Sequence, residues 1–147
     1  IIKVVDFWNS IGMKVEQMDA EHHDRVLAMT SHIPQLIAYS IVATATELED
    51  HLKSEVIKYS AAGFRDFTRL AGSDPIMWRD IYSVNKDAVL EMLGRFTEDL
   101  STLQKAIRNG DLEFLEKTFR STREIRKAIE DLGQAGTFDP TESEKTK

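Results

Sequence analysis

One long helical pattern dominates the chain, and its centre at residues 26–43 reads VLAMTSHIPQLIAYSIVA. From Ala20 to Leu48 the pattern contains no glycine, and its apolar residues recur on almost every side of a helix. A helix with so little polar surface has to be enclosed by other helices. The sequence therefore predicts an all-α domain, in which a second copy of the chain covers part of this helix.

Start signals mark the other helices. Asp19 is a predicted N-cap, and so is Asp74, which is followed by Pro75 at the first helical position, where a missing N–H costs nothing. Pro34 lies inside the long helix and predicts a bend or a restart there. A later apolar stripe over residues 89–107 predicts another long helix, and a final helix follows it.

The first residues have a different pattern. Residues 1–11 show helical spacing that stops at Gly12, and residues 13–18 alternate like a short strand. A lone strand lacks a pairing partner. We therefore expect residues 1–18 to be the remnant of an α/β domain, and the chain, which begins at Ile1 without a methionine, to be a piece of a longer polypeptide.

The helical domain is predicted to cover residues 19–135, with a helix end at Gly110. Its last helix is predicted to turn four apolar side chains inward, Leu115, Phe119, Ile129 and Leu132. Residues 136–147 are rich in polar residues and carry too few apolar ones to pack, so we expect a disordered tail.

Composition limits the possible partners. The 147 residues carry a net charge of −6, so a nucleic-acid backbone or an anionic membrane would be repelled on average. The longest apolar run, residues 36–43, is far shorter than the roughly 20 residues of a membrane span. Without cysteine there is no disulfide and no thiolate chemistry. We expect a cytoplasmic protein that binds neither nucleic acid nor membrane.

Neither a nucleotide loop nor a metal motif stands out. The seven glycines form no G-x-G-x-x-G and no G-x-x-x-x-G-K-[ST], so the chain has no recognisable phosphate cradle. Among the histidines, at positions 22, 23, 32 and 51, only His22 and His23 are close in sequence. Adjacent helical residues diverge by about 100°, so these two rings do not easily share one ion. We expect no metal and assign both histidines to the first helical turn.

His32 admits two interpretations. It could be a core histidine with a satisfied ring, or it could contact a ligand. Pro34 frees the backbone carbonyl near Thr30, and Ser31, His32 and Gln35 then form a polar cluster that packing does not require. Buried polar groups need partners, and a ligand is one such partner.

The run Gly63-Phe64-Arg65-Asp66-Phe67-Thr68-Arg69 is the second candidate. Asp66 and Arg69 are three residues apart, so Asp66 could orient the guanidinium toward a carboxylate. The alternative is a surface ion pair worth about 0–1 kcal/mol. Phe64 and Phe67 favour partial burial, which would make a bound anion welcome beside Arg69.

These motifs resemble a known family. Thr30-Ser31-His32-Ile33-Pro34, then Gly63 to Arg69, then Ser73-Asp74-Pro75-Ile76-Met77-Trp78-Arg79-Asp80 are similar in order and spacing to the C-terminal domain of prephenate/arogenate (cyclohexadienyl) dehydrogenases. The resemblance covers roughly residues 1–135. It implies an N-terminal Rossmann domain that binds NAD or NADP, an interlocked helical dimer, and a substrate cleft between the two domains; residues 1–18 would then be the end of that nucleotide-binding domain.

The resemblance also implies roles for individual residues. His32 would line the substrate pocket, Arg69 would bind a substrate carboxylate, Asp66 would hold Arg69, and Trp78 would close one wall. Gln35 occupies a pocket position at which relatives often carry histidine. The catalytic histidine of the family belongs to the N-terminal domain, so no catalytic residue is expected in this chain.

The function implied for the full-length protein is oxidative decarboxylation of prephenate or arogenate in tyrosine biosynthesis. The chain alone is expected to form a homodimer, to bind no NAD and to be inactive. The alternative is a stand-alone helical dimerisation or regulatory module without catalysis, in which Arg69 would have no role.

Overall fold

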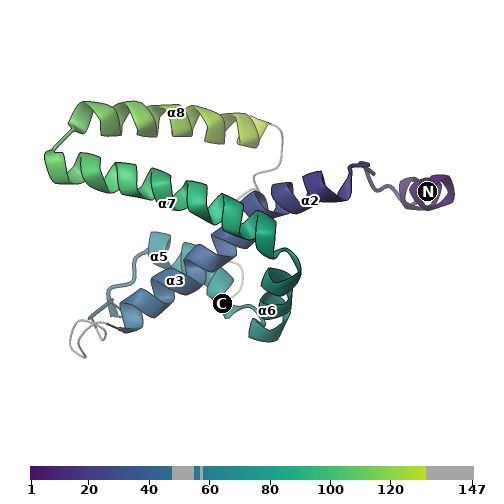
Figure 1. The fold of residues 1–147 in the computed structure, drawn as a ribbon, viewed down its shortest axis with the longest axis horizontal. Coiled ribbons are helices and arrows are strands. Elements are labelled where there is room, and N and C mark those ends of the chain that lie inside the picture. Colours follow the sequence, from purple (N-terminus) through teal and green to yellow (C-terminus); the bar gives the residue numbers. More distant parts are fainter. Residues whose placement is uncertain (48–54, 57, 132–147) are drawn as a thin grey trace, which may run out of the picture. The chain divides into compact units, whose positions relative to one another are not determined.

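The computed structural model describes residues 1–47, 55–56 and 58–131. Throughout these residues the regular structure is helical, without a strand, which confirms the all-α prediction. The elements are α1 (Ile2–Ser10), α2 (Ala20–Leu27), the π-helix η1 (Ala28–His32), α3 (Ile33–Thr46), α5 (Ala62–Thr68), the 3₁₀-helix η2 (Arg69–Gly72), α6 (Pro75–Val84), α7 (Lys86–Asn109) and α8 (Leu112–Asp131) (Figure 1). The described residues up to Phe96 and those from Thr97 onward form two separate compact units.

Both predicted N-caps are confirmed. The Asp19 side chain accepts a hydrogen bond of 2.9 Å from the backbone N–H of His22, within the first turn of α2. The Asp74 carboxylate accepts from the N–H of Ile76 at 2.7 Å, and Pro75 begins α6. These bonds satisfy backbone donors that the first helical turn leaves free.

Glycines with positive φ end two helices, as predicted. Gly12 has φ +86°, and its N–H donates to Asn9 while the next N–H, of Met13, donates to Trp8. Gly110 has φ +67° at the end of α7. Its N–H donates to the Ile107 carbonyl, and the next N–H, of Asp111, donates to the Ala106 carbonyl. A residue with a Cβ is strained in this left-handed conformation, which explains glycine at both positions.

The strand predicted for residues 13–18 was wrong. These residues form neither a helix nor a strand, because no neighbouring strand within the described residues pairs with them. Assigning residues 1–18 to a nucleotide-binding domain therefore stays a prediction. His51 and the tail 136–147 lie outside the described residues.

The first unit has a small core between the long helix and the start of α7. Ala28 and Ile33 pack with Val89 of α7, and all three are at most 5% exposed. Partly buried side chains surround them, from Ile37, Tyr82, Ala88, Met92, Leu93 and Phe96. The core therefore fixes η1 and the start of α3 against α7.

The combined helix Ala20–Thr46 is long and apolar enough to cross a membrane, judged by length and composition alone. Enclosed core helices of soluble proteins pass the same test. Here the helix buries two polar side chains, His32 and Gln35, which hydrogen bond to other parts of the domain. Such partners are typical of a helix that packs inside a protein.

Several apolar side chains remain exposed in the single chain. Met29 on the long helix is 53% exposed. On α8, Phe119 is 55% and Ile129 39% exposed, so the prediction that they face inward was wrong for one chain by itself. Leu132, predicted with them, lies outside the described residues.

Candidate functional site

A π turn places His32. The N–H of Ile33 donates to the carbonyl of Ala28, five residues back, instead of four. Pro34 explains this, because it has no N–H and its ring would clash with the Thr30 carbonyl in a regular α-helix. The wider turn accommodates the ring and restarts the helix as α3, which confirms the expectation for Pro34.

The His32 ring lies in an aromatic environment. His32 is 7% exposed, and its ring centroid lies 6.0 Å from that of Trp78 and 6.4 Å from that of Tyr82, both in edge-to-face arrangements. The Tyr82 hydroxyl donates to the backbone carbonyl of His32 at 3.0 Å. Burial lowers the pKa of His32, and burial together with Tyr39 raises the pKa of Tyr82 to about 12. Both side chains are therefore neutral near pH 7.

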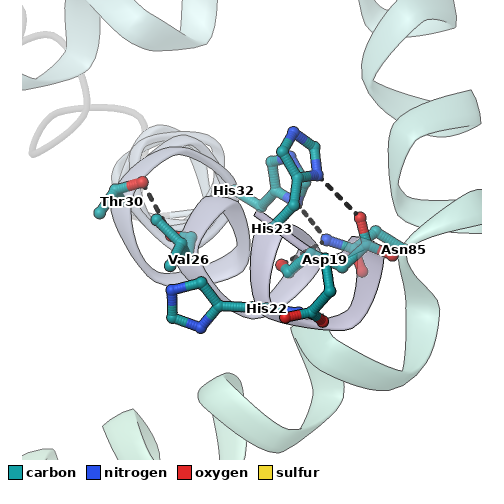
Figure 2. Close-up of polar contacts among 8 residues, drawn as sticks. Asp19, His22, His23, Val26, Thr30, His32 and Asn85 are labelled. Carbon is teal, nitrogen blue, oxygen red and sulfur yellow. Dashed lines mark hydrogen bonds and ion pairs between the residues drawn. The ribbon is translucent and has the colours of Figure 1, made fainter. Parts of the chain in front are cut away.

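Asn85 contacts the same ring. Its Nδ2 lies 3.2 Å from His32 Nδ1 and 2.9 Å from the backbone oxygen of Asp24. Figure 2 shows the Asn85 amide beside the His32 ring, with these contacts as dashed lines. The amide thus connects η1, α2 and the junction between α6 and α7.

Trp78 carries an unsatisfied donor. Its indole Nε1 is buried and has no hydrogen-bond partner, while its ring packs against His32 and lies 5.8 Å from Tyr82 between centroids. Buried N–H groups without an acceptor are rare and costly in native proteins. This donor needs an acceptor that the described residues do not supply.

Gln35 and Tyr39 join α3 to η2. Gln35 is 2% exposed, and its Nε2 donates to the Leu70 carbonyl at 2.7 Å. The Tyr39 hydroxyl donates to the Ser73 carbonyl at 3.0 Å. These bonds position the backbone of the 3₁₀ turn that begins at Arg69.

Arg69 and Asp66 are both exposed, and the ion pairs found among the described residues do not include one between them. The chain leaves the α-helix at Thr68, and water competes for both side chains. The structure therefore does not make the contact by which Asp66 was expected to hold Arg69.

The structure brings some predicted residues together and adds others. His32 and Trp78 are in ring contact, and Gln35 reaches the segment of Arg69 through Leu70. Sequence reasoning missed Tyr82 and Asn85. Their spacing from Trp78 was the available signal, because positions i, i+4 and i+7 share one face of a helix.

His22 and His23 show no metal geometry. His23 Nδ1 lies 3.1 Å from Asp24 Oδ1, and the described part of the chain contains no group of three His, Asp or Glu side chains that could hold an ion. The backbone N–H of His22 donates a hydrogen bond to the Asp19 side chain, the N-cap of α2.

Comparisons with known proteins agree with this architecture. A family model described as prephenate dehydrogenase, dimerization domain, matches residues 19–121. The cyclohexadienyl dehydrogenase of Zymomonas mobilis is 40% identical over 129 residues, which cover 88% of this chain and 44% of that protein. The prephenate dehydrogenase of Bacillus subtilis is 34% identical over 113 residues, covering 77% of this chain and 30% of that protein.

A solved structure shows the same fold. It is the prephenate dehydrogenase of Aquifex aeolicus in complex with hydroxyphenyl propionate and NAD⁺, with a TM-score of 0.80 and 35% identity. The match covers 87% of this chain and 45% of that one, so the chain spans less than half the length of these relatives. Because the family model covers most of the chain, the chain belongs to the prephenate dehydrogenase family and contains its dimerization domain.

Proposed function

We propose that this chain is the substrate-side, dimer-forming part of a cytoplasmic NAD- or NADP-dependent prephenate or arogenate dehydrogenase. The relatives extend well beyond the matched region, and the chain lacks a glycine-rich phosphate loop. The nucleotide would therefore bind to a separate domain of the full-length protein. That nucleotide would supply the hydride acceptor for oxidative decarboxylation of the substrate ring.

The buried Trp78 Nε1 beside His32 carries the proposal for the pocket. A cyclohexadienyl substrate combines an apolar ring with hydroxyl and carboxylate oxygens. The aromatic rings of Trp78 and Tyr82 suit the substrate ring, and a substrate oxygen would supply the acceptor that Trp78 lacks. Within this pocket the chain would bind the substrate and exclude water, while the catalytic residue belongs to the other domain.

Arg69 is the proposed carboxylate ligand. Its guanidinium is exposed and takes part in no ion pair within the described residues, so it is available for a charge-assisted bond. Gln35 would support Arg69 indirectly, through its bond to the Leu70 carbonyl. Asp66 would hold Arg69 only if the two side chains came into contact, and they form no ion pair in this structure.

The family description and the exposed apolar side chains support a homodimer. Met29 and Phe119 are each more than half exposed in one chain, and burying the exposed part of such side chains would be favourable by about 1–1.5 kcal/mol each. A second copy would supply the cover predicted for the long helix.

Substitution of Arg69 in the full-length protein tests the function. Arg69→Ala should weaken binding of prephenate or arogenate by about 1.5–3 kcal/mol, the range for charge-assisted hydrogen bonds. Arg65→Ala, at an exposed arginine of α5, is the matched control and should have little effect. Substrate-dependent reduction of NAD⁺ and NADP⁺ would be followed by absorbance.

Two results would contradict the proposal. If Arg69→Ala and Arg65→Ala behave alike, the chain acts as a dimerisation or regulatory module. If the purified chain alone reduces NAD⁺ with either substrate, it is not half of an active site.

A further inference from the structure

The Asn85 side chain is held by a fixed backbone. The backbone N–H of Asn85 donates to the Ile81 carbonyl at 2.9 Å, at the end of α6. The backbone carbonyl of Asn85 accepts from the N–H of Val89 at 3.1 Å, in the first turn of α7. Both helices thus restrain the backbone of Asn85, and its side-chain amide contacts α2 and η1 from this fixed position.

The contacts of the Asn85 side-chain amide determine its orientation and the position of the proton on the His32 ring. The backbone oxygen of Asp24 only accepts hydrogen bonds, so the group facing it at 2.9 Å has to be the Asn85 NH₂. The same Nδ2 lies 3.2 Å from His32 Nδ1 and directs its second hydrogen there. His32 Nδ1 must therefore carry a lone pair, because an N–H at that position would point at another N–H.

We infer that Asn85 is a positioning residue that holds His32 in the tautomer with its proton on Nε2. The ring then has one N–H to donate, on the nitrogen farther from Asn85, and no hydrogen bond of the described residues uses that nitrogen. Trp78 Nε1 is a second free donor on a ring in contact with His32. Two such N–H groups would bind an oxygen acceptor, which is a substrate oxygen if the proposed function holds.

The choice of asparagine matters for this role. An aspartate at position 85 would offer only acceptors, so it would repel the Asp24 carbonyl and attract a proton to His32 Nδ1. Asn85→Asp, which replaces only the side-chain NH₂ by an oxygen, should therefore move the His32 proton from Nε2 to Nδ1. Asn109→Asp makes the same change at an exposed asparagine of α7 and serves as the control.

The test is nitrogen NMR of the full chain labelled with ¹⁵N-histidine, at about pH 9, well above the ordinary histidine pKa of about 6.5. We expect the His32 proton on Nε2 in the wild-type chain and in Asn109→Asp, and on Nδ1 in Asn85→Asp. A proton on Nδ1 in the wild-type chain would overturn the inference, and so would an unchanged tautomer in Asn85→Asp. Circular dichroism confirms that each variant is folded, and Asn85→Ala, which should populate both tautomers, replaces any aspartate variant that is not.

A second measurement separates this inference from the proposed function. In the full-length protein, Asn85→Asp should raise KM for prephenate or arogenate about tenfold, the loss of roughly one hydrogen bond to a charged group, while Asn109→Asp should not. If the tautomer switches but the wild-type protein uses neither substrate, the proposed function fails and the role of Asn85 stands. If the substrates are used but the tautomer does not switch, the inference fails by itself.

Discussion

Gln35 donates a 2.7 Å hydrogen bond from Nε2 to the carbonyl oxygen of Leu70, which lies 35 positions further along the chain. Gln35 is 2% exposed, so water does not replace this bond when it is lost. It fixes the backbone next to Arg69 from a helix that also carries His32 at its start. The buried Gln35 amide therefore links the segments that carry His32 and Arg69, two of the predicted substrate-binding residues.

Gln35→Leu should destabilise the domain by about 1–3 kcal/mol, because the Leu70 carbonyl loses its buried donor. Urea denaturation would measure the change in the free energy of unfolding. Gln17→Leu, at an exposed position before α2, is the control and should stay within about 0.5 kcal/mol. Equal stability of both variants would show that the Leu70 carbonyl does not depend on Gln35.

Stability should also depend on the titration of His32. Burial lowers its pKa in the folded chain below the value of 6.5. At a pH between the lowered pKa of the folded chain and the ordinary pKa of the unfolded chain, the unfolded chain binds a proton that the folded chain does not. The free energy of unfolding therefore falls as pH falls below about 6.5. Denaturation at several pH values should show this slope, and His32→Gln should reduce it. A slope unaffected by His32→Gln would disprove the assignment.

Gly110 and Gly94 give opposite predictions for one substitution. Gly110 has φ +67°, so Gly110→Ala should destabilise by about 1 kcal/mol. Gly94 lies within α7, where an added Cβ would meet no other atom within 4 Å, so Gly94→Ala should stabilise by about 0.5–1 kcal/mol. Thermal unfolding of both variants checks the pair, and a change of the same sign in both would be inconsistent with the helix end at Gly110.

Phe119 should contribute to the proposed dimer. It is 55% exposed and lines an apolar groove of about 470 Å³ together with Leu100, Leu103 and Ile107. Phe119→Asp should shift the sedimentation of the chain toward monomer, because a charge would have to be buried in the interface. Ser121→Asp, also exposed on α8, is the matched change and should leave the dimer intact. A dimer unaffected by Phe119→Asp would place the interface elsewhere.

Local features of the fold could be predicted from the sequence because they depend on near neighbours. The caps at Asp19 and Asp74 and the helix ends at Gly12 and Gly110 each involve bonds within a few residues. The strand at 13–18 was predicted from alternation alone, which says nothing about whether a second strand is present.

The site was harder to predict because its contacts are distant in sequence. Asn85 meets residues 53 and 61 positions away, and the Tyr82 hydroxyl meets a carbonyl 50 positions away. Family resemblance predicted roles for His32 and Trp78, but it did not predict that Asn85 and Tyr82 contact His32. The exposure of Phe119 was missed because apolar spacing marks a face for burial without saying whether the same chain covers it.

The π turn at Ala28–His32 acts on the helix as a one-residue insertion would. Since each residue of an α-helix turns the chain by about 100°, the extra residue rotates every side chain of α3 by that angle relative to α2. Deleting one residue from the turn would rotate α3 by that angle and separate Gln35 and Tyr39 from the carbonyls of Leu70 and Ser73. The number of residues in this turn therefore sets the rotation of α3 relative to α2. Insertions and deletions here are expected to be tolerated far less well than substitutions.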